Sequence, residues 1–225
     1  MNPIEAVLDA TDRCLSTIDA LTDEQLRGPS GLPGWSRGHV VAHIGGHAHG
    51  SARALRGLRT GGPVAVYDSQ EARDAEVEAR SGAPAAELAS YVQLGCLRLA
   101  GELRLMKAVG EVERVPGGPR FTIPELVEAR WREVEVHHAD LDAGYRPADW
   151  PTAFAAYLLE DVAEQRGKEL DLTLHARDLE KTVLVGRGGH GVAGTAADLA
   201  WWLTGRGDGE GLTSTRPLPT LGAWR

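Results

Sequence analysis

The sequence is poor in cysteine and has no basic stripe, and each of these absences excludes a class of protein. Only two cysteines, Cys14 and Cys96, occur among 225 residues. Both fall in apolar stretches with helical periodicity, so we expect two reduced thiols in the core and not a disulfide. The net charge is −8, and this argues against a nucleic-acid-binding protein.

The chain also lacks the long hydrophobic segments of membrane and exported proteins. No apolar run attains the roughly 18 residues that a transmembrane helix requires. The N-terminal sequence MNPIEAVLDATDR has neither the basic region nor the apolar core of a secretory signal. We therefore expect a cytoplasmic protein with no membrane partner. Its net negative charge also means that specific arginines must hold any anionic substrate.

Helical periodicity covers most of the first two thirds of the chain. Four long amphipathic segments have apolar residues every three or four positions, which is typical of helices. Start signals precede them, such as Ser36 before the second segment, Pro84 before the third, and the capping box TIPE at residues 122–125 before the fourth, which we expect to end near Ala143. Four such helices with connections of mixed length predict a mostly α fold with a four-helix bundle over residues 1–148.

The last third of the chain has a different pattern. The helical segment WPTAFAAYLLEDVAEQRG is followed by two alternating stretches, LDLTLHARD and KTVLVGRGG, that are typical of strands. A further helical segment, GTAADLAWWLTGRGDGEG, ends in a glycine-rich turn. Residues 149–225 are therefore expected to form a small C-terminal α/β domain.

Six of the eight histidines lie in two short segments of the expected bundle. The first segment reads GWSRGHVVAHIGGHAHG. His39, His43 and His47 recur every four residues along one face of the helix, whereas His49 lies to the side. This ladder spans about 12 Å, so only one or two of its members can reach a single ion. His43 lies one turn inside the helix beside apolar residues and is the best-placed candidate.

The second histidine segment, RWREVEVHHADL, adds a carboxylate. Glu133 and His137 are four residues apart and share a face that flanking leucines indicate is directed inward. A carboxylate on an inward face is costly unless it is paired or binds a cation. Helical spacing places Glu135 on the outward face, and His138 about 100° from the face of His137.

Spacing alone leaves two interpretations of these residues open. Glu133 could form an ion pair with Arg130 or Arg37, and the histidines could be hydrogen-bonded core residues. Alternatively, His43 could meet Glu133 and His137 across the bundle core, where facing helices commonly build metal sites.

Four stretches together resemble the mycothiol-dependent maleylpyruvate isomerase family of the DinB-like superfamily of metal-binding helical bundles. They are GWSRGHVVAHI, VYDSQEARDAEVE, RWREVEVHHADL and TGRGDGEGL, in the family's order along the chain. The resemblance implies a DinB-like N-terminal bundle, a small α/β C-terminal domain and a site between them. Glu135 and His138 depart from the family pattern, which has apolar residues there, and His47 is also unexpected.

The resemblance further implies the site residues. The family's metal ligands fall on His43, Glu133 and His137, which would hold zinc or another divalent metal and leave positions open for a thiol. The family's C-terminal arginine, which contacts substrate or thiol cofactor, falls on Arg206. From position alone, Arg206 could equally be a cation that stabilises the C-terminal end of a helix.

The activity that the resemblance implies is the mycothiol-dependent conversion of maleylpyruvate to fumarylpyruvate. A metal-stabilised thiolate would add to the activated double bond, the adduct would rotate about the new single bond, and elimination would follow. One alternative is a mycothiol S-transferase that releases the adduct of another electrophile, such as a natural-product or xenobiotic intermediate. Another is a non-haem iron oxygenase, because two histidines and a carboxylate also form the facial triad of those enzymes.

Overall fold

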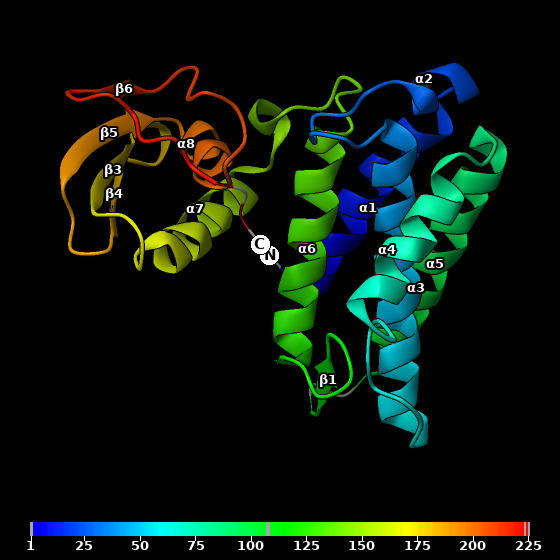
Figure 1. Ribbon diagram of the computed structural model, residues 1–225. Helices are drawn as coiled ribbons and strands as arrows, with labels where there is room; N and C mark the ends of the chain where they lie inside the picture. Colours follow the sequence, from blue (N-terminus) through cyan, green and yellow to red (C-terminus); the bar gives the residue numbers. More distant parts are fainter. Residues whose placement is uncertain (1, 107–108, 223, 225) are drawn as a thin grey trace. The chain divides into compact units, whose positions relative to one another are not determined.

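The computed structural model describes residues 2–106, 109–222 and 224, and it divides into two compact units, residues 1–145 and 146–225. Both units are shown in Figure 1. The first unit contains the helices α1 (Pro3–Asp19), α2 (Asp23–Arg27), α3 (Arg37–Thr60), α4 (Gln70–Ser81), α5 (Ala85–Leu105) and α6 (Ile123–Asp140), and a hairpin of β1 (Glu111–Glu113) and β2 (Arg120–Thr122). The expected mostly α fold with a small C-terminal α/β region is confirmed.

Local start signals set where the two helices that carry the expected metal ligands begin. The side chain of Ser36 accepts the backbone N–H of His39 at the start of α3, and Thr122 accepts that of Glu125 at the start of α6. Such capping boxes satisfy amide donors that have no partner in the first turn of a helix. Helix α6 ends at Asp140, before the expected position near residue 143. Its end is followed by Asp142 in the left-handed region, with a φ of 49°.

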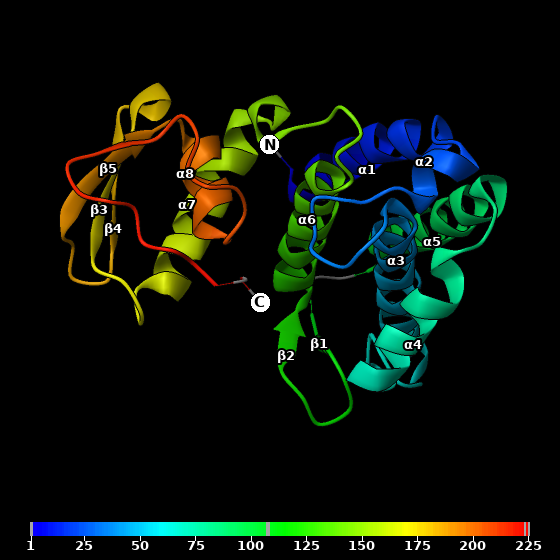
Figure 2. The same ribbon diagram turned by 45° about the horizontal axis from the view of Figure 1, so that its top comes forward.

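The four long helices of the first unit surround one apolar core. Helix α3 contacts α5 and α6, and α1 contacts the same two helices. In Figures 1 and 2, α4 lies along the outside of α3. The largest core side chains include Ile44, Leu55, Leu88, Leu126 and Leu141, none of which is more than 3% exposed. Each such side chain contributes about 1.5–3 kcal/mol through burial, so this core fixes α3 and α6 beside each other.

A glycine in α3 lets the segment that follows the helix approach it closely. A Cβ atom at Gly50 would lie only 2.2 Å from the carbonyl oxygen of Val66. On its other side, Val66 is bound to the hairpin, because its N–H donates to the carbonyl oxygen of Glu113. The extended segment at residues 64–67 is therefore held between α3 and β1, and it carries Tyr67 into the bundle interior.

The second unit combines a four-stranded sheet with two helices. Its elements are η1 (Pro147–Asp149), α7 (Thr152–Arg166), β3 (Leu172–Ala176), η2 (Arg177–Leu179), β4 (Lys181–Val185), β5 (His190–Gly194), α8 (Ala196–Leu203) and β6 (Thr213–Ser214). The strand order is β4-β3-β5-β6, and only β3 and β5 are parallel. Helices α7 and α8 pack on each other and against the sheet. Strands β5 and β6 were not expected, because β5 contains two glycines and β6 has only two residues.

Both cysteines are free and buried, as expected. Burial, and then the neighbouring thiol of Cys96, raise the pKa of Cys14 to about 12. The Cys14 thiol is therefore protonated at neutral pH. Within the described ranges, no helix is long and apolar enough to cross a membrane.

Candidate metal centre

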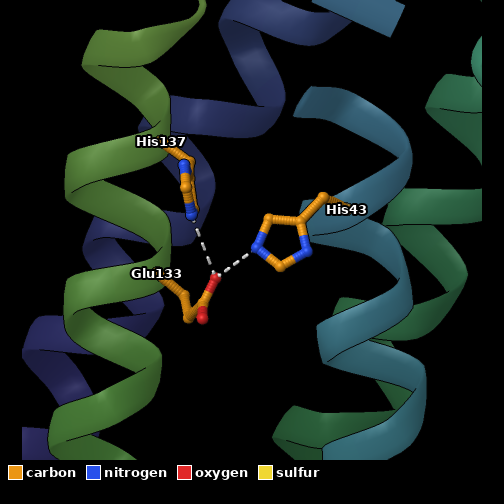
Figure 3. Close-up of side chains that lie close together, drawn as sticks. All are labelled: His43, Glu133 and His137. Carbon is orange, nitrogen blue, oxygen red and sulfur yellow. Dashed lines mark ion pairs between the residues drawn. The ribbon is translucent and has the colours of Figure 1, made fainter. Parts of the chain in front are cut away.

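Helices α3 and α6 bring the three expected metal ligands together. His43 projects from α3, and Glu133 and His137 project from successive turns of α6 (Figure 3). Nε2 of His43 lies 2.9 Å from Oε2 of Glu133, and Nε2 of His137 lies 3.4 Å from the same oxygen. One ligand atom from each of the three residues lies within 4.8 Å of the others. A single ion can therefore contact all three side chains.

Arg37, at the start of α3, aligns this helix with the end of α6. Its Nε donates to the carbonyl oxygen of Leu141, and its Nη2 donates to that of Asp142, each at 2.7 Å. Carbonyl groups at the end of a helix lack partners within the helix and carry partial negative charge, so a guanidinium is stabilised there. Arg37 thus caps α6. It does not form the ion pair with Glu133 that the sequence left open.

The side chain of Arg130 also forms its hydrogen bonds with groups other than Glu133. Its side chain is 1% exposed, and it donates to the carbonyl oxygen of Ile44 at 3.0 Å and to Sγ of Cys96 at 3.3 Å. It reaches Nδ1 of His47 at 3.4 Å as well. The ion pairs of Glu133 within the described ranges are those with His43, His47 and His137.

The contact with Arg130 determines which nitrogen of His47 carries its proton. A guanidinium has only donors, so Nδ1 of His47 must accept and the proton of the neutral ring lies on Nε2. Nε2 in turn lies 3.9 Å from Oε1 of Glu133. Burial lowers the pKa of His47 to about 3, although the Glu133 carboxylate opposes this shift. His47 therefore faces the second oxygen of Glu133 as a neutral ring.

The carboxylate of Glu133 has an unmet requirement for a positive partner. Its buried Oε2 atom has no hydrogen bond of good geometry to any described residue, although it lies 2.9 Å from Nε2 of His43 and 3.4 Å from Nε2 of His137. Burial favours the neutral acid, but the surrounding imidazoles, His47 first, outweigh burial and hold the pKa of Glu133 well below its usual range. An ionised, buried oxygen without a hydrogen bond is costly, and a cation would satisfy it. Two imidazoles and a carboxylate are the donor set of many catalytic zinc sites, so these residues fit a divalent metal.

Two neighbours that sequence reasoning missed orient the histidines. Nδ1 of His137 donates to Oδ2 of the buried Asp140 at 2.8 Å, which leaves Nε2 directed at the centre. Carboxylates commonly hold metal-binding histidines in this way. The spacing of Asp140, three residues after His137, was an available signal. On the other side, Nη2 of Arg73 donates to Nδ1 of His43 at 3.2 Å. Arg73 lies on α4 and His43 on α3, so helical spacing could not predict their contact.

The remaining histidines of the first segment have partners outside the centre. Nδ1 of His39 accepts the backbone N–H of Ser36 at 3.2 Å and so belongs to the cap of α3. Nε2 of His49 donates to the carbonyl oxygen of Tyr91 at 2.9 Å. The four histidines of this segment therefore do not form one site.

The expectation that Glu135 faces outward is wrong, because its side chain is 0% exposed. Helix α1 covers that face of α6, and Arg13 donates to Oε1 of Glu135 at 2.7 Å. The Tyr145 hydroxyl donates to Oε2 of Glu135 at 2.6 Å. His138 is buried as well, stacked on the ring of Tyr145 with a centroid distance of 3.8 Å. Helical periodicity gives the direction of a side chain but not what covers it.

Arg206 lies in the second unit, just after α8. Its Nη1 donates to the carbonyl oxygen of Thr204 at 3.5 Å, and its guanidinium lies 5.5 Å from the ring centroid of Trp201. These contacts agree with a cation at the C-terminal end of a helix. Its contact with a substrate or thiol stays a prediction.

Comparison with known proteins supports the resemblance found in the sequence. Residues 7–142 match the family model described as the mycothiol maleylpyruvate isomerase N-terminal domain. The whole chain is similar in fold to the crystal structures of a mycothiol-dependent maleylpyruvate isomerase and of a histidine-to-alanine mutant of it. Each comparison gives 22% identity and a TM-score of 0.88, covering 99% of this chain and 95% of the other. No curated protein sequence matches the chain.

The family match extends over the parts of the chain that form the candidate centre. It includes α3 with His43 and α6 with Glu133 and His137, and it covers more than half of the sequence. On this basis, the chain belongs to the mycothiol maleylpyruvate isomerase family.

Proposed function

We propose that this protein is a metal- and thiol-dependent isomerase that converts maleylpyruvate to fumarylpyruvate with mycothiol as its thiol. The observation that carries the proposal is the convergence of His43, Glu133 and His137 on one point, in a chain of this family. A divalent metal held there, zinc by its donor set, would lower the pKa of an incoming thiol and so supply the thiolate.

The residues around the centre have distinct parts in this proposal. Asp140 holds the proton of His137 on Nδ1, so that Nε2 is free to act as a ligand. Nε2 of His43 can act as a ligand only when its proton lies on Nδ1, and a protonated Nδ1 cannot accept from Arg73. Arg73 would then turn away from His43 and become available to a substrate carboxylate through a charge-assisted hydrogen bond.

The covalent bonds of the reaction form and break between the thiol and the substrate alone. The thiol sulfur adds to the activated double bond, which becomes a single bond and allows rotation. Elimination of the thiol then restores the double bond in the trans geometry. Arg206 would hold a carboxylate of the substrate during this rotation, preferably by a two-point contact.

A thiol-dependent turnover assay on maleylpyruvate tests the proposal. Metal-loaded protein is given maleylpyruvate with mycothiol, with glutathione or without thiol, and the products and free thiol are quantified by chromatography. We expect fumarylpyruvate to form with mycothiol while the amount of free thiol stays constant.

The other outcomes distinguish the alternative activities. Stoichiometric loss of thiol, with accumulation of an adduct, would indicate an S-transferase. Turnover that requires iron and consumes oxygen, whether or not thiol is present, would indicate an oxygenase and overturn the thiol mechanism.

A further inference from the structure

A buried tyrosine near the candidate metal centre has a hydroxyl group that the fold does not use. Tyr67 is 7% exposed, and its hydroxyl has no hydrogen bond to any residue of the described ranges. Other tyrosines of the same unit are paired: Tyr91 donates to Glu76 at 2.8 Å, and Tyr145 donates to Glu135 at 2.6 Å. Because buried hydroxyls normally have a partner, Tyr67 requires a separate explanation.

The backbone of Tyr67 is fixed beside the centre. Its N–H donates to the carbonyl oxygen of Arg114 at 2.9 Å, which ties the residue to the segment that follows β1. Its ring lies edge-on to that of His47, with a centroid distance of 6.4 Å and an angle of 66° between the rings. His47 in turn faces Glu133. Tyr67 is thus next to the ring that faces the Glu133 carboxylate.

The hydroxyl of Tyr67 is also a permanent donor. Burial, and then the charge of Glu133, raise its pKa well above the usual range of a phenol. Arg73, Arg114 and Arg130 oppose this shift without reversing it. At any pH at which the protein works, Tyr67 therefore offers an O–H group to an acceptor.

Tyr67 lines a cavity in the first unit, with its hydroxyl oxygen buried. The cavity has a volume of about 710 Å³ and lies between α3, α4 and α5. Arg73, which contacts His43, lines it together with Tyr67. A volume of this size accommodates a small organic acid. The same two residues therefore border both the surroundings of the metal ligands and a space that a ligand can enter.

We propose that Tyr67 donates a hydrogen bond to the substrate's carbonyl oxygen, as a catalytic residue of the isomerisation proposed above, on which this inference rests. When the thiolate forms a carbon–sulfur bond, the electron pair of the double bond shifts toward the conjugated carbonyl, and its oxygen becomes an enolate. Tyr67 stabilises this negative charge by its hydrogen bond and keeps its proton. When the carbonyl re-forms, the pair restores the double bond and the carbon–sulfur bond breaks. Donors placed where charge develops accelerate such steps strongly.

The variant Tyr67→Phe tests this role because it removes only the hydroxyl. We expect kcat to fall about 100-fold, the effect typical of losing one donor to an oxyanion, while KM for the thiol and the metal content stay unchanged. The Tm of the metal-free variant should equal or exceed that of the wild type, because the lost hydroxyl has no partner in the fold. A residue that is needed only for structure gives the opposite shift in Tm.

Tyr91→Phe is the matched control. In the wild type, the hydroxyl of Tyr91 is paired with Glu76, so the loss of this hydroxyl should lower the Tm by a few degrees and leave kcat unchanged. The inference is overturned if Tyr67→Phe keeps the wild-type kcat, or if it loses Tm, metal and activity together. A wild-type enzyme without thiol-dependent turnover overturns the proposed function, and this inference with it. An active wild type with a fully active Tyr67→Phe variant overturns the inference alone.

Discussion

The carboxylate of Glu133 organises the candidate centre, and each neighbouring side chain can be distinguished by the atom it contacts. His43 and His137 approach Oε2, whereas His47 approaches Oε1. Asp140 contacts Nδ1 of His137, the ring nitrogen that is directed away from Glu133. Substitutions of these residues should therefore have separable effects on metal content.

Replacing any one of the three proposed ligands should remove most of the bound metal. His43→Ala, Glu133→Ala and His137→Ala each leave two ligands, and two protein ligands bind a divalent ion weakly. Metal analysis of protein purified from zinc-supplemented growth gives the measurement. His49→Ala is the control and should keep its metal, because its ring is bound to the carbonyl oxygen of Tyr91. Metal-free wild-type protein after such growth contradicts the assignment.

Glu135 should contribute to stability and not to metal binding. Glu135→Ala leaves Arg13 and the Tyr145 hydroxyl without their shared acceptor. Since Arg13 is partly exposed, we expect the free energy of unfolding to fall by about 2–3 kcal/mol, slightly less than for a fully buried pair. Chemical denaturation measures this change, and Glu135→Gln should lose less because its amide oxygen still accepts. Equal stability of Glu135→Ala and wild type shows that the pair contributes nothing.

His49 should make the fold sensitive to mild acid. Burial lowers its pKa from 6.5, and its hydrogen bond to the Tyr91 carbonyl only partly opposes this. The unfolded chain therefore takes up a proton before the folded one, and stability is lost as the pH falls below 6.5. His49→Gln should show a shallower decline of Tm between about pH 6.5 and 5. Parallel Tm–pH curves for the variant and the wild type would show that His49 does not cause the loss of stability in mild acid.

Helix α3 combines several functions along its length. Arg37 at its start caps α6, His43 faces the centre, and Gly50 admits the segment that carries Tyr67. A shift of this helix would therefore disturb the ligands and the cavity wall together.

Two glycines in helices should respond oppositely to substitution by alanine. Gly50→Ala should destabilise the protein, because its Cβ would meet the backbone of Val66 at 2.2 Å. Gly101→Ala in α5 has open space around its Cβ and should stabilise by about 0.5–1 kcal/mol through helix propensity. Thermal unfolding of both variants checks the pair. Stabilisation by both would show that residues 64–67 move away from α3 at little cost.

The elements differ in how far the sequence could predict them. Helices α3 and α6 begin at Ser36 and Thr122 because capping is a local interaction. The burial of Glu135 was missed because it depends on α1, which is distant in sequence. The positions of Tyr67 and Arg73 depend on the path of the chain between α3 and α5, which hydrogen bonds to the hairpin determine. Such long-range contacts leave no periodic signal in the sequence.

The whole molecule keeps its own thiols apart from the chemistry proposed for it. Cys14 is 2% exposed, and Cys96 is 8% exposed with its sulfur beside Arg130. A protein that uses an external thiol benefits from this, because its own thiols do not compete for the metal or the substrate.

Thiol labelling of the native protein should therefore be slow. We expect neither cysteine to react with an aromatic disulfide reagent at neutral pH within minutes, because both thiols are buried and the raised pKa of Cys14 keeps that thiol protonated, which makes it a poor nucleophile. Both should react at once in denaturant, and reducing agents should leave the Tm unchanged. Rapid reaction of one equivalent in the native protein would contradict the buried positions.

The proposed ligands come from α3 and α6, which are separated by more than sixty residues of chain. An ion between them would close this long loop, and it would bind the folded chain in preference to the unfolded one. Its binding free energy would then add to folding, by about 2.7 kcal/mol when the free ion is at 100 times its dissociation constant. The supply of metal would thus affect both the stability of the protein in the cell and its catalytic rate.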